Sequence, residues 1–174
     1  MKSVIDIFSP EGLQAISRYV MPETVFVFNL DSLASASGSN STPTDINESI
    51  RSILEKLSHL GKVAAITRNP SVSTVDLLGF EPLFSLGSSQ PAADESGFAK
   101  ALQSNGIYRA VLFGDGIVDA ALIAVKGFDI LGIHTGDPAE CATRYYLNRH
   151  TALLGLLNSI AGILETDRLV AHDT

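Results

Sequence analysis

The chain contains one cysteine and no tryptophan among its 174 residues. A single thiol, Cys141, cannot form an internal disulfide, and no cluster of cysteine and histidine has the spacing of a zinc site. Asp6 and Glu11 interrupt the N-terminal region, where a secretory signal needs an unbroken apolar run. The longest uncharged apolar segment near either end, residues 151–164, is shorter than the roughly 20 residues that span a bilayer. We therefore expect a cytoplasmic protein without a membrane span.

Basic residues are scarce as well, with 12 Lys and Arg against 19 Asp and Glu, which gives a formal net charge of -7. A surface of this sign repels phosphate backbones, so nucleic acid is not expected as a partner. Charged residues make up only 18% of the chain and apolar residues 45%, a balance that excludes a disordered or coiled-coil chain. The length fits one domain, which we place at residues 1–166, followed by a tail at 167–174 that we expect to fray.

Short β-rich apolar runs alternate with segments of helical period along the chain. This alternation is typical of a parallel sheet covered by helices on both faces, so we predict a three-layer, doubly wound α/β fold of the Rossmann-like type. Gly79, Gly106 and Gly127 are predicted to end helices. The predicted strands are 25–30, 62–67, 83–86, 110–114 and 128–133, with a possible sixth at 142–148, and the predicted helices are 46–60, 72–78, 95–104, 117–125 and 150–165.

Polar residues follow several of the predicted strands. In an open parallel sheet, ligands bind outside the carboxyl ends of the strands. Asp31 follows the first predicted strand, Thr67 ends the second, and Asp115 and Asp119 follow the fourth. Their carboxylates would converge on one crevice and supply oxygen ligands suited to Mg²⁺ beside a phosphate. Taken singly, each residue is equally well explained as a turn former, a loop start or part of a first helical turn.

The segments around these residues resemble motifs of the haloacid dehalogenase superfamily. FVFNLDSLA (26–34) resembles the first motif, a strand ending in Asp-x-Asp-Gly-Thr; AITRNP (65–70) resembles the second; VLFGDGIVDAALIAV (111–125) resembles the fourth, Gly-Asp-x-x-x-Asp. Within the superfamily, the chain is most similar to trehalose-6-phosphate phosphatases over about residues 7–164. The resemblance implies a Mg²⁺-dependent phosphatase core.

By this resemblance, each polar residue takes a role. Asp31 occupies the acid/base position, Thr67 and Arg68 the phosphate-binding positions, and Asp31, Asp115 and Asp119 the metal positions.

The chain departs from the superfamily pattern at several of its functional positions. Asn29 stands where the family has its nucleophilic aspartate, and a neutral carboxamide cannot form the aspartyl-phosphate intermediate. Loss of a covalent nucleophile costs about 10⁴ to 10⁶ in rate. Ser96 stands at the position of the phosphate-clamping lysine, with Lys100 one helical turn away. Ser32 and Leu33 replace the Gly-Thr pair that follows the second aspartate.

Two further segments of the chain are shorter than the corresponding segments of the superfamily. The interval between Thr67 and Ser96 is too short to contain a cap domain, and the acidic run after the fourth strand is shortened. An engineered Asp-to-Asn trap would explain Asn29 alone but not the other departures. We therefore expect a core domain without a cap, in which the Mg²⁺ site is weak or empty.

Three hypotheses for function follow. The first is a catalytically inactive phosphatase-like protein with a binding, regulatory or structural role. The alternative is a residual Mg²⁺-dependent phosphatase, in which Asp31 activates water on a small phosphorylated substrate such as trehalose 6-phosphate. The third is a protein partner, or a second copy of the chain, bound through the helix at 150–165. We favour the alternative that the apolar stripe of this helix packs on the sheet, because a doubly wound sheet needs helices on both faces. The stripe comprises Leu153, Leu156, Leu157, Ile160, Ile163 and Leu164.

The four histidines, His59, His134, His150 and His172, lie on different predicted elements. None of them has a second histidine or a cysteine close by in the sequence. We therefore predict none as a metal ligand or as a general base.

Overall fold

Within the part of the chain that the structure describes, seven parallel strands form the central sheet, in the order β1-β7-β6-β5-β2-β3-β4. The computed structural model describes residues 5–36, 48–70, 73–88, 92–114, 120–135, 145–147 and 150–172. The strands are β1 (Ile5–Asp6), β2 (Val25–Asn29), β3 (Lys62–Ile66), β4 (Ser85–Leu86), β5 (Arg109–Gly114), β6 (Asp129–Thr135) and β7 (Tyr145–Leu147). The predicted α/β class is confirmed.

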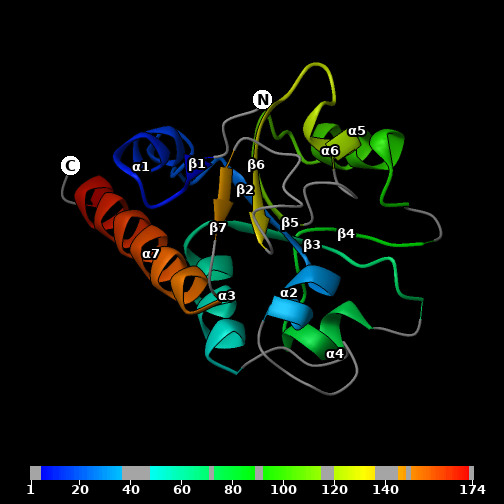
Figure 1. Cartoon of the computed structure of the whole chain (residues 1–174), viewed down its shortest axis with the longest axis horizontal. Helices are drawn as coiled ribbons and strands as arrows, with labels where there is room; N and C mark the ends of the chain where they lie inside the picture. The colour runs from blue at the N-terminus through cyan, green and yellow to red at the C-terminus, as the bar shows by residue number, and fades with distance from the viewer. Residues whose placement is uncertain are drawn as a thin grey trace.

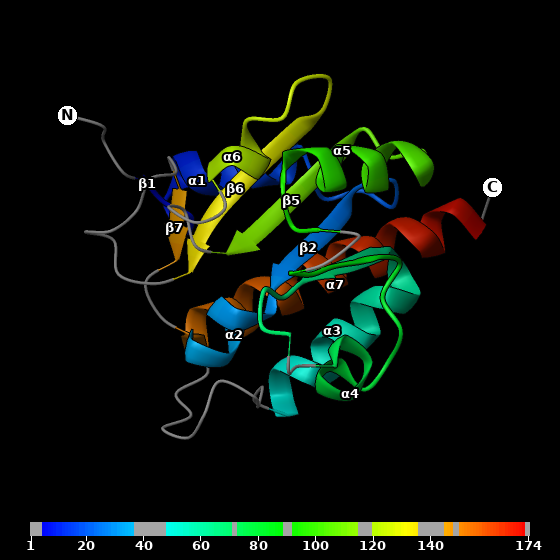
Figure 2. The same cartoon turned by 90° about the vertical axis from the view of Figure 1, so that its right-hand side faces the viewer.

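Helices cover both faces of this sheet (Figures 1 and 2). Those with bounds in the described residues are α1 (Pro10–Ser17), α2 (Leu30–Ala36), α3 (Glu48–Leu60), α4 (Thr74–Leu78), α5 (Glu95–Ser104), α6 (Ala120–Ile123) and α7 (His150–His172). Residues of α1, α3, α4 and α7 pack in one hydrophobic cluster, and residues of α5 and α6 pack in a second. The sheet therefore separates two cores, as a three-layer fold requires.

Alternate residues of the central strands belong to different cores. Phe26 and Phe28 of β2 pack on the side of α3 and α7, whereas Val25 and Val27 pack on the side of α5 and α6. Successive side chains of a strand point to opposite faces of the sheet, so each strand supplies both cores. This explains why β2 is buried along its whole length and why its sequence is an unbroken apolar run.

The apolar stripe of α7 packs against the core, as the favoured alternative predicts. Five of its predicted members are buried, whereas Ile163 is 46% exposed, so the prediction was wrong for that residue. The helix extends to His172, beyond the predicted end at 165. Residues 167–172 are therefore helical rather than a frayed tail. No helix within the described residues combines the length and the hydropathy needed to cross a membrane.

Two short elements near the chain start were not predicted. The first is the two-residue strand β1, which pairs with β7. The second is α2, which begins at Leu30 directly after β2, whereas the predicted strand continued to residue 30. The predicted strand at 83–86 shortens to Ser85–Leu86. The predicted sixth strand at 142–148 corresponds to β7, of which the structure describes Tyr145–Leu147.

A polar cluster lies at the amino-terminal edge of the sheet. The Tyr19 hydroxyl donates a hydrogen bond of 2.5 Å to Asp129 Oδ1, and Arg109 Nε lies 3.5 Å from Asp129 Oδ2. Arg109 also donates to Met21 Sδ at 3.4 Å. These contacts join the segment after α1 to the first residues of β5 and β6.

Burial and the hydrogen bond to Asp129 raise the pKa of Tyr19 from 10.0 to about 12. The unfolded chain releases this proton near pH 10, whereas the folded chain retains it until about pH 12. The stability that Tyr19 contributes is therefore complete below pH 10 and is lost as the pH rises through 12. We expect Tyr19→Phe to be less stable than the wild type below pH 10, with the difference shrinking toward pH 12. Urea unfolding of both proteins across this range measures the effect, and a constant difference would contradict it.

The hydroxyl of Thr24, directly before β2, is buried. Its side chain is fully buried, and Oγ1 has no hydrogen-bond partner among the described residues. Burying such a group without a partner costs about 1–3 kcal/mol. We expect Thr24→Val, which replaces the hydroxyl by a methyl group of similar size, to raise the free energy of unfolding by about 1 kcal/mol. Thr24→Ser keeps the hydroxyl and removes the methyl group, so it should be destabilising. Urea unfolding compares the three proteins, and a destabilised valine variant would show that the hydroxyl has a partner.

Candidate functional site

The strand order identifies where a ligand is expected to bind. The chain runs from β2 outward through β3 to β4, then returns to β5 on the other side of β2 and continues outward to β6. The direction of winding therefore changes between β2 and β5. Ligands of open parallel sheets bind in the crevice outside the carboxyl ends of the strands at such a switch point. Asn29 ends β2 and Gly114 ends β5, so these two residues border the expected crevice.

Asn29, predicted at the nucleophile position, is buried beneath the first turn of α2. Its side chain is 3% exposed. The Oδ1 atom accepts hydrogen bonds from the backbone N–H groups of Asp31 at 3.0 Å and of Ser32 at 3.2 Å. This is the bonding pattern of a helix N-cap, a position at which asparagine is favoured. The amide oxygen of Asn29 therefore stabilises the start of α2.

Asp31 joins α2 to the end of β3. Its Oδ1 atom accepts a hydrogen bond of 2.8 Å from the Thr67 hydroxyl, and its Oδ2 atom accepts one of 2.9 Å from the Arg68 backbone N–H. Thr67 is buried, and its Oγ1 atom also accepts from the Asn69 N–H at 3.3 Å. The structure thus brings together three of the predicted site residues, Asp31, Thr67 and Arg68, at the same edge of the sheet.

Arg68 and Ser96, also predicted as site residues, line one cavity. Arg68 Nη2 donates to the Ala93 carbonyl at 3.1 Å, immediately before α5. The N-cap of α5 is Asp94, whose Oδ1 accepts from Gly97 N at 2.7 Å, and the exposed Ser96 lies in the first turn of α5. The cavity has a volume of about 410 Å³, and its lining consists of Arg68, Ala93, Asp94, Glu95, Ser96, Ala121 and Leu122.

The predicted metal site is only partly covered by the structure. Asp115 and Asp119 lie outside the described residues. Within the described part of the chain, no group of three or more His, Cys, Asp or Glu side chains could hold a metal ion. Mg²⁺ prefers six oxygen ligands in octahedral geometry, and both oxygens of Asp31 already accept hydrogen bonds. The described residues therefore do not by themselves fit a Mg²⁺ ion.

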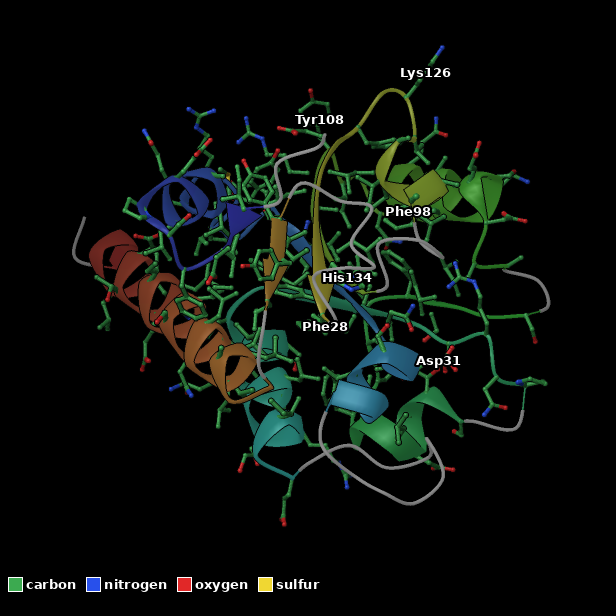
Figure 3. The ribbon with its side chains drawn as sticks, viewed as in Figure 1. Phe28, Asp31, Phe98, Tyr108, Lys126 and His134 are labelled. Atoms are coloured by element: carbon green, nitrogen blue, oxygen red, sulfur yellow. The ribbon has the colours of Figure 1, made fainter. Side chains whose placement is uncertain are left out.

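His134 also lies at this edge, although its sequence context did not predict it as a site residue. It lies near the carboxyl end of β6, is 4% exposed, and is in register with Gly114 of β5. The predicted strand at 128–133 stopped one residue before it. Extending that strand would have placed His134 next to the candidate crevice. Figure 3 shows Asp31 and His134 toward the same edge of the sheet, with Tyr108 and Lys126 at the opposite edge.

We expect Asp31→Asn to lower the free energy of unfolding by about 1–2 kcal/mol. An amide has only one acceptor oxygen, so its N–H₂ group would have to face either the Thr67 hydroxyl or the Arg68 backbone N–H. Facing the Arg68 N–H would place two hydrogen-bond donors opposite each other. Urea unfolding measures the change. Asp76→Asn, at an exposed carboxylate of α4, is the matched control and should change stability little. Equal stability of the Asp31 variant and the wild type would contradict a structural role for this carboxylate.

The overall fold occurs in a protein of known structure. A hypothetical protein from Xanthomonas campestris matches this chain with a TM-score of 0.65 and 15% sequence identity, and the match covers 97% of each chain. The doubly wound α/β fold is shared. This likeness extends to the fold alone. No protein-family model and no curated protein matches the chain.

Proposed function

We propose that this chain is a non-catalytic protein of the haloacid dehalogenase type, similar to trehalose-6-phosphate phosphatases, which acts by binding. The observation that carries this proposal is the environment of Asn29. At the position of the nucleophile in the superfamily, the chain has a neutral carboxamide whose oxygen accepts two backbone N–H groups at the start of α2. An atom held in this way has neither the charge nor the freedom to attack phosphorus.

The hydrogen bonds of Asp31 support the same proposal. In the residual phosphatase hypothesis, this carboxylate must take a proton from an attacking water molecule. In the structure its Oδ1 atom accepts a hydrogen bond from the Thr67 hydroxyl and its Oδ2 atom accepts one from the Arg68 backbone N–H, so that it links α2 to the end of β3. These bonds stabilise the carboxylate in a fixed position and explain its presence without catalysis.

The charge of the cavity between Arg68 and α5 also disfavours a phosphate substrate. The lining contains Arg68 together with two acidic residues, Asp94 and Glu95, and Ser96 supplies no charge where the superfamily has lysine. A phosphate dianion would therefore meet more negative than positive charge there. Binding of a protein or of a small molecule, rather than turnover, is the role that we assign to this edge of the sheet.

A phosphatase assay tests the proposal directly. The purified chain is incubated with Mg²⁺ and a panel of phosphomonoesters that includes p-nitrophenyl phosphate, glucose 6-phosphate and trehalose 6-phosphate, and released phosphate is measured. We expect phosphate release equal to that of the buffer blank, and intact-protein mass spectrometry should show no phosphoryl adduct.

Asp31→Asn provides the decisive comparison. Turnover by the wild type that is lost in this variant would overturn the proposal and establish the residual phosphatase in its place. A phosphoryl adduct on any side chain would overturn it as well. Asp76→Asn controls for changes caused by the loss of a carboxylate elsewhere on the surface.

A further inference from the structure

The C-terminal end of α5 is closed by a Schellman motif. The Ile107 N–H donates to the Leu102 carbonyl at 2.9 Å, and the Gly106 N–H donates to the Gln103 carbonyl at 3.1 Å. Gly106 has a φ of +65°, the left-handed conformation that this motif requires and that glycine adopts without strain. Ile107 is buried and belongs to the same hydrophobic cluster as Leu102, so this turn anchors α5 to the core.

Asn105 is the last residue before this turn, and glycine follows it directly. Its side-chain Nδ2 donates to the Ala101 carbonyl at 2.7 Å, and its backbone N–H donates to the same carbonyl at 3.2 Å. Asn105 is half-buried, whereas Gly106 is exposed. The side-chain amide therefore lies at the end of the helix that solvent can reach.

An asparagine that precedes glycine has a direct chemical route to deamidation. After losing its proton to hydroxide, the glycine backbone nitrogen attacks the asparagine Cγ. A new C–N bond forms, the bond from Cγ to the side-chain nitrogen breaks, and ammonia leaves. Water then opens the resulting succinimide at either carbonyl, which gives aspartate or isoaspartate. The reaction consumes water and base catalysis only, and no atom changes its oxidation state.

Gly106 leaves the attacking nitrogen unhindered. Any other residue at this position would carry a Cβ atom beside the nitrogen, whereas glycine has none. Apart from its chain neighbours and the nearby backbone, no atom of the described residues lies within 4 Å of a Cβ atom built at Gly106. Space is therefore available around the atom that must approach the Asn105 side chain.

Two features of the folded chain delay this reaction. Ring closure brings the Gly106 nitrogen toward the Asn105 side chain, so ψ of Asn105 must rotate away from its value of 7°. The bonds to the Ala101 and Gln103 carbonyls must also be released. Opening of a helix end is local and belongs to the low end of the free energies of opening. The reaction is thus gated by fraying of the last turn of α5.

Asn29 and Asn69, two other asparagines of the described residues, lack this route. Asn29 is 3% exposed. Asn69 is followed by Pro70, whose backbone nitrogen has no hydrogen to lose and cannot close the ring.

Asn158 provides the closest comparison with Asn105. It is more exposed than Asn105, and its Nδ2 donates to the Leu154 carbonyl at 3.0 Å, the same bond to the residue four positions earlier. However, Asn158 lies in the interior of α7 and is followed by Ser159. The two residues therefore differ in the neighbouring residue and in the position within the helix, not in the bond of the side chain.

We propose that Asn105 is a site of spontaneous deamidation, gated by opening of the last turn of α5. This inference goes beyond the proposed function and does not depend on it. The turn lies just before Tyr108, which Figure 3 shows at the edge of the sheet opposite to Asp31.

The products weaken the anchor of α5. An aspartate carboxylate at this position would face the Ala101 carbonyl oxygen, and its negative charge would oppose the helix dipole at the C-terminal end. Isoaspartate lengthens the backbone by a carbon atom and so displaces Ile107 from the Leu102 carbonyl. Deamidation therefore loosens the connection between α5 and β5.

Peptide mapping by mass spectrometry tests the inference on the full chain, incubated in mildly alkaline buffer with and without urea. We expect the peptide that contains Asn105 to gain the mass difference between N–H₂ and hydroxyl. Conversion should be about ten- to hundredfold slower in the folded chain than in the urea-unfolded chain. Asn158, the matched control, should remain an amide in the folded chain over the same period.

Three outcomes of this experiment would overturn the inference. The first is absence of product at Asn105 in the folded chain after about ten half-lives of the reaction in the unfolded chain. The second is an equal rate in the folded and unfolded chains, because the last turn of α5 would then exert no control. The third is faster conversion of Asn158 than of Asn105 in the folded chain, because exposure alone would then decide the site.

Variants assign the mass gain and test its consequence. Asn105→Gln keeps a side-chain amide but must close a larger ring, so the mass gain should disappear, and its persistence would overturn the assignment. Asn105→Asp reproduces one product and should speed hydrogen exchange of the Ile107 amide by about tenfold. Asn158→Asp is the control and should leave this exchange unchanged. Equal exchange in Asn105→Asp and the wild type would overturn the weakened anchor, and aged wild-type protein gives the same readout without a variant.

Discussion

Phe28→Ala is expected to lower the free energy of unfolding by about 3–5 kcal/mol. Phe28 is 1% exposed and lies in β2, the strand between β3 and β5. Its ring stacks on that of Phe113, with centroids 4.9 Å apart and ring planes inclined by 4°. Truncation would remove this contact and leave a cavity in the core beneath α3 and α7. Because the flanking strands are held by their own neighbours, the cavity can close only partly, which places the cost in the upper range for a core residue.

Urea unfolding at equilibrium measures this loss. Phe8→Ala is the matched control, since Phe8 is the same residue type but 40% exposed, and we expect its effect to be below about 1 kcal/mol. A comparable loss in the two variants would contradict the central role of Phe28. Phe28 directly precedes Asn29, so the variant should also broaden the NMR signals of the Asn29 side chain.

Gly97→Ala is expected to lower the free energy of unfolding by about 3 kcal/mol, at the upper end for an overpacked site. Gly97 lies in the first turn of α5. A Cβ atom at this position would overlap the Ala92 carbonyl oxygen and would lie 3.1 Å from the Ala92 carbonyl carbon and 3.2 Å from Asp94 Oδ1. Backbone atoms cannot swing aside as a flexible side chain can. Relief of the clash therefore requires the segment before α5 to move, which disturbs the cap formed by Asp94 and the bond from Arg68 to Ala93.

Gly162→Ala in α7 gives the opposite expectation. Apart from its chain neighbours and the nearby backbone of α7, no atom of the described residues lies within 4 Å of a Cβ atom built at Gly162. Alanine is the better helix former, so the free energy of unfolding of this variant should rise by about 0.5–1 kcal/mol. Thermal unfolding followed by circular dichroism compares the two variants with the wild type. Similar shifts in both would show that helix propensity rather than the contact with Ala92 decides the effect at Gly97.

Elements with strong local signals were predicted from the sequence. The bounds of α5 agree with the predicted helix at 95–104, and the three glycines predicted to end helices, Gly79, Gly106 and Gly127, all have positive φ. The order of strands and helices was sufficient to predict the parallel sheet. It also placed Asp31 and Thr67 at the same edge, where a hydrogen bond joins them.

Other features depend on contacts between distant parts of the chain. A two-residue strand such as β1 has no recognisable period, and it forms because β7 offers it a partner. Tyr19 and Asp129 are separated by 110 positions, so no local pattern indicates their hydrogen bond. His134 was missed because β6 ends later than its apolar run suggests. The hydrogen bonds of Asn29 were missed because no helix was predicted directly after the first strand.

The pairing of β1 with β7 also bears on biosynthesis. Ile5 is in register with Tyr145, so the first described strand leaves the ribosome long before its partner does. Every pair of described strands in this sheet is parallel and needs a crossover segment, so no two of these strands can form a hairpin as an early local nucleus. During translation, β1 therefore cannot pair until the segment that contains Tyr145 has been synthesised, and the incomplete sheet has an unpaired edge throughout that interval.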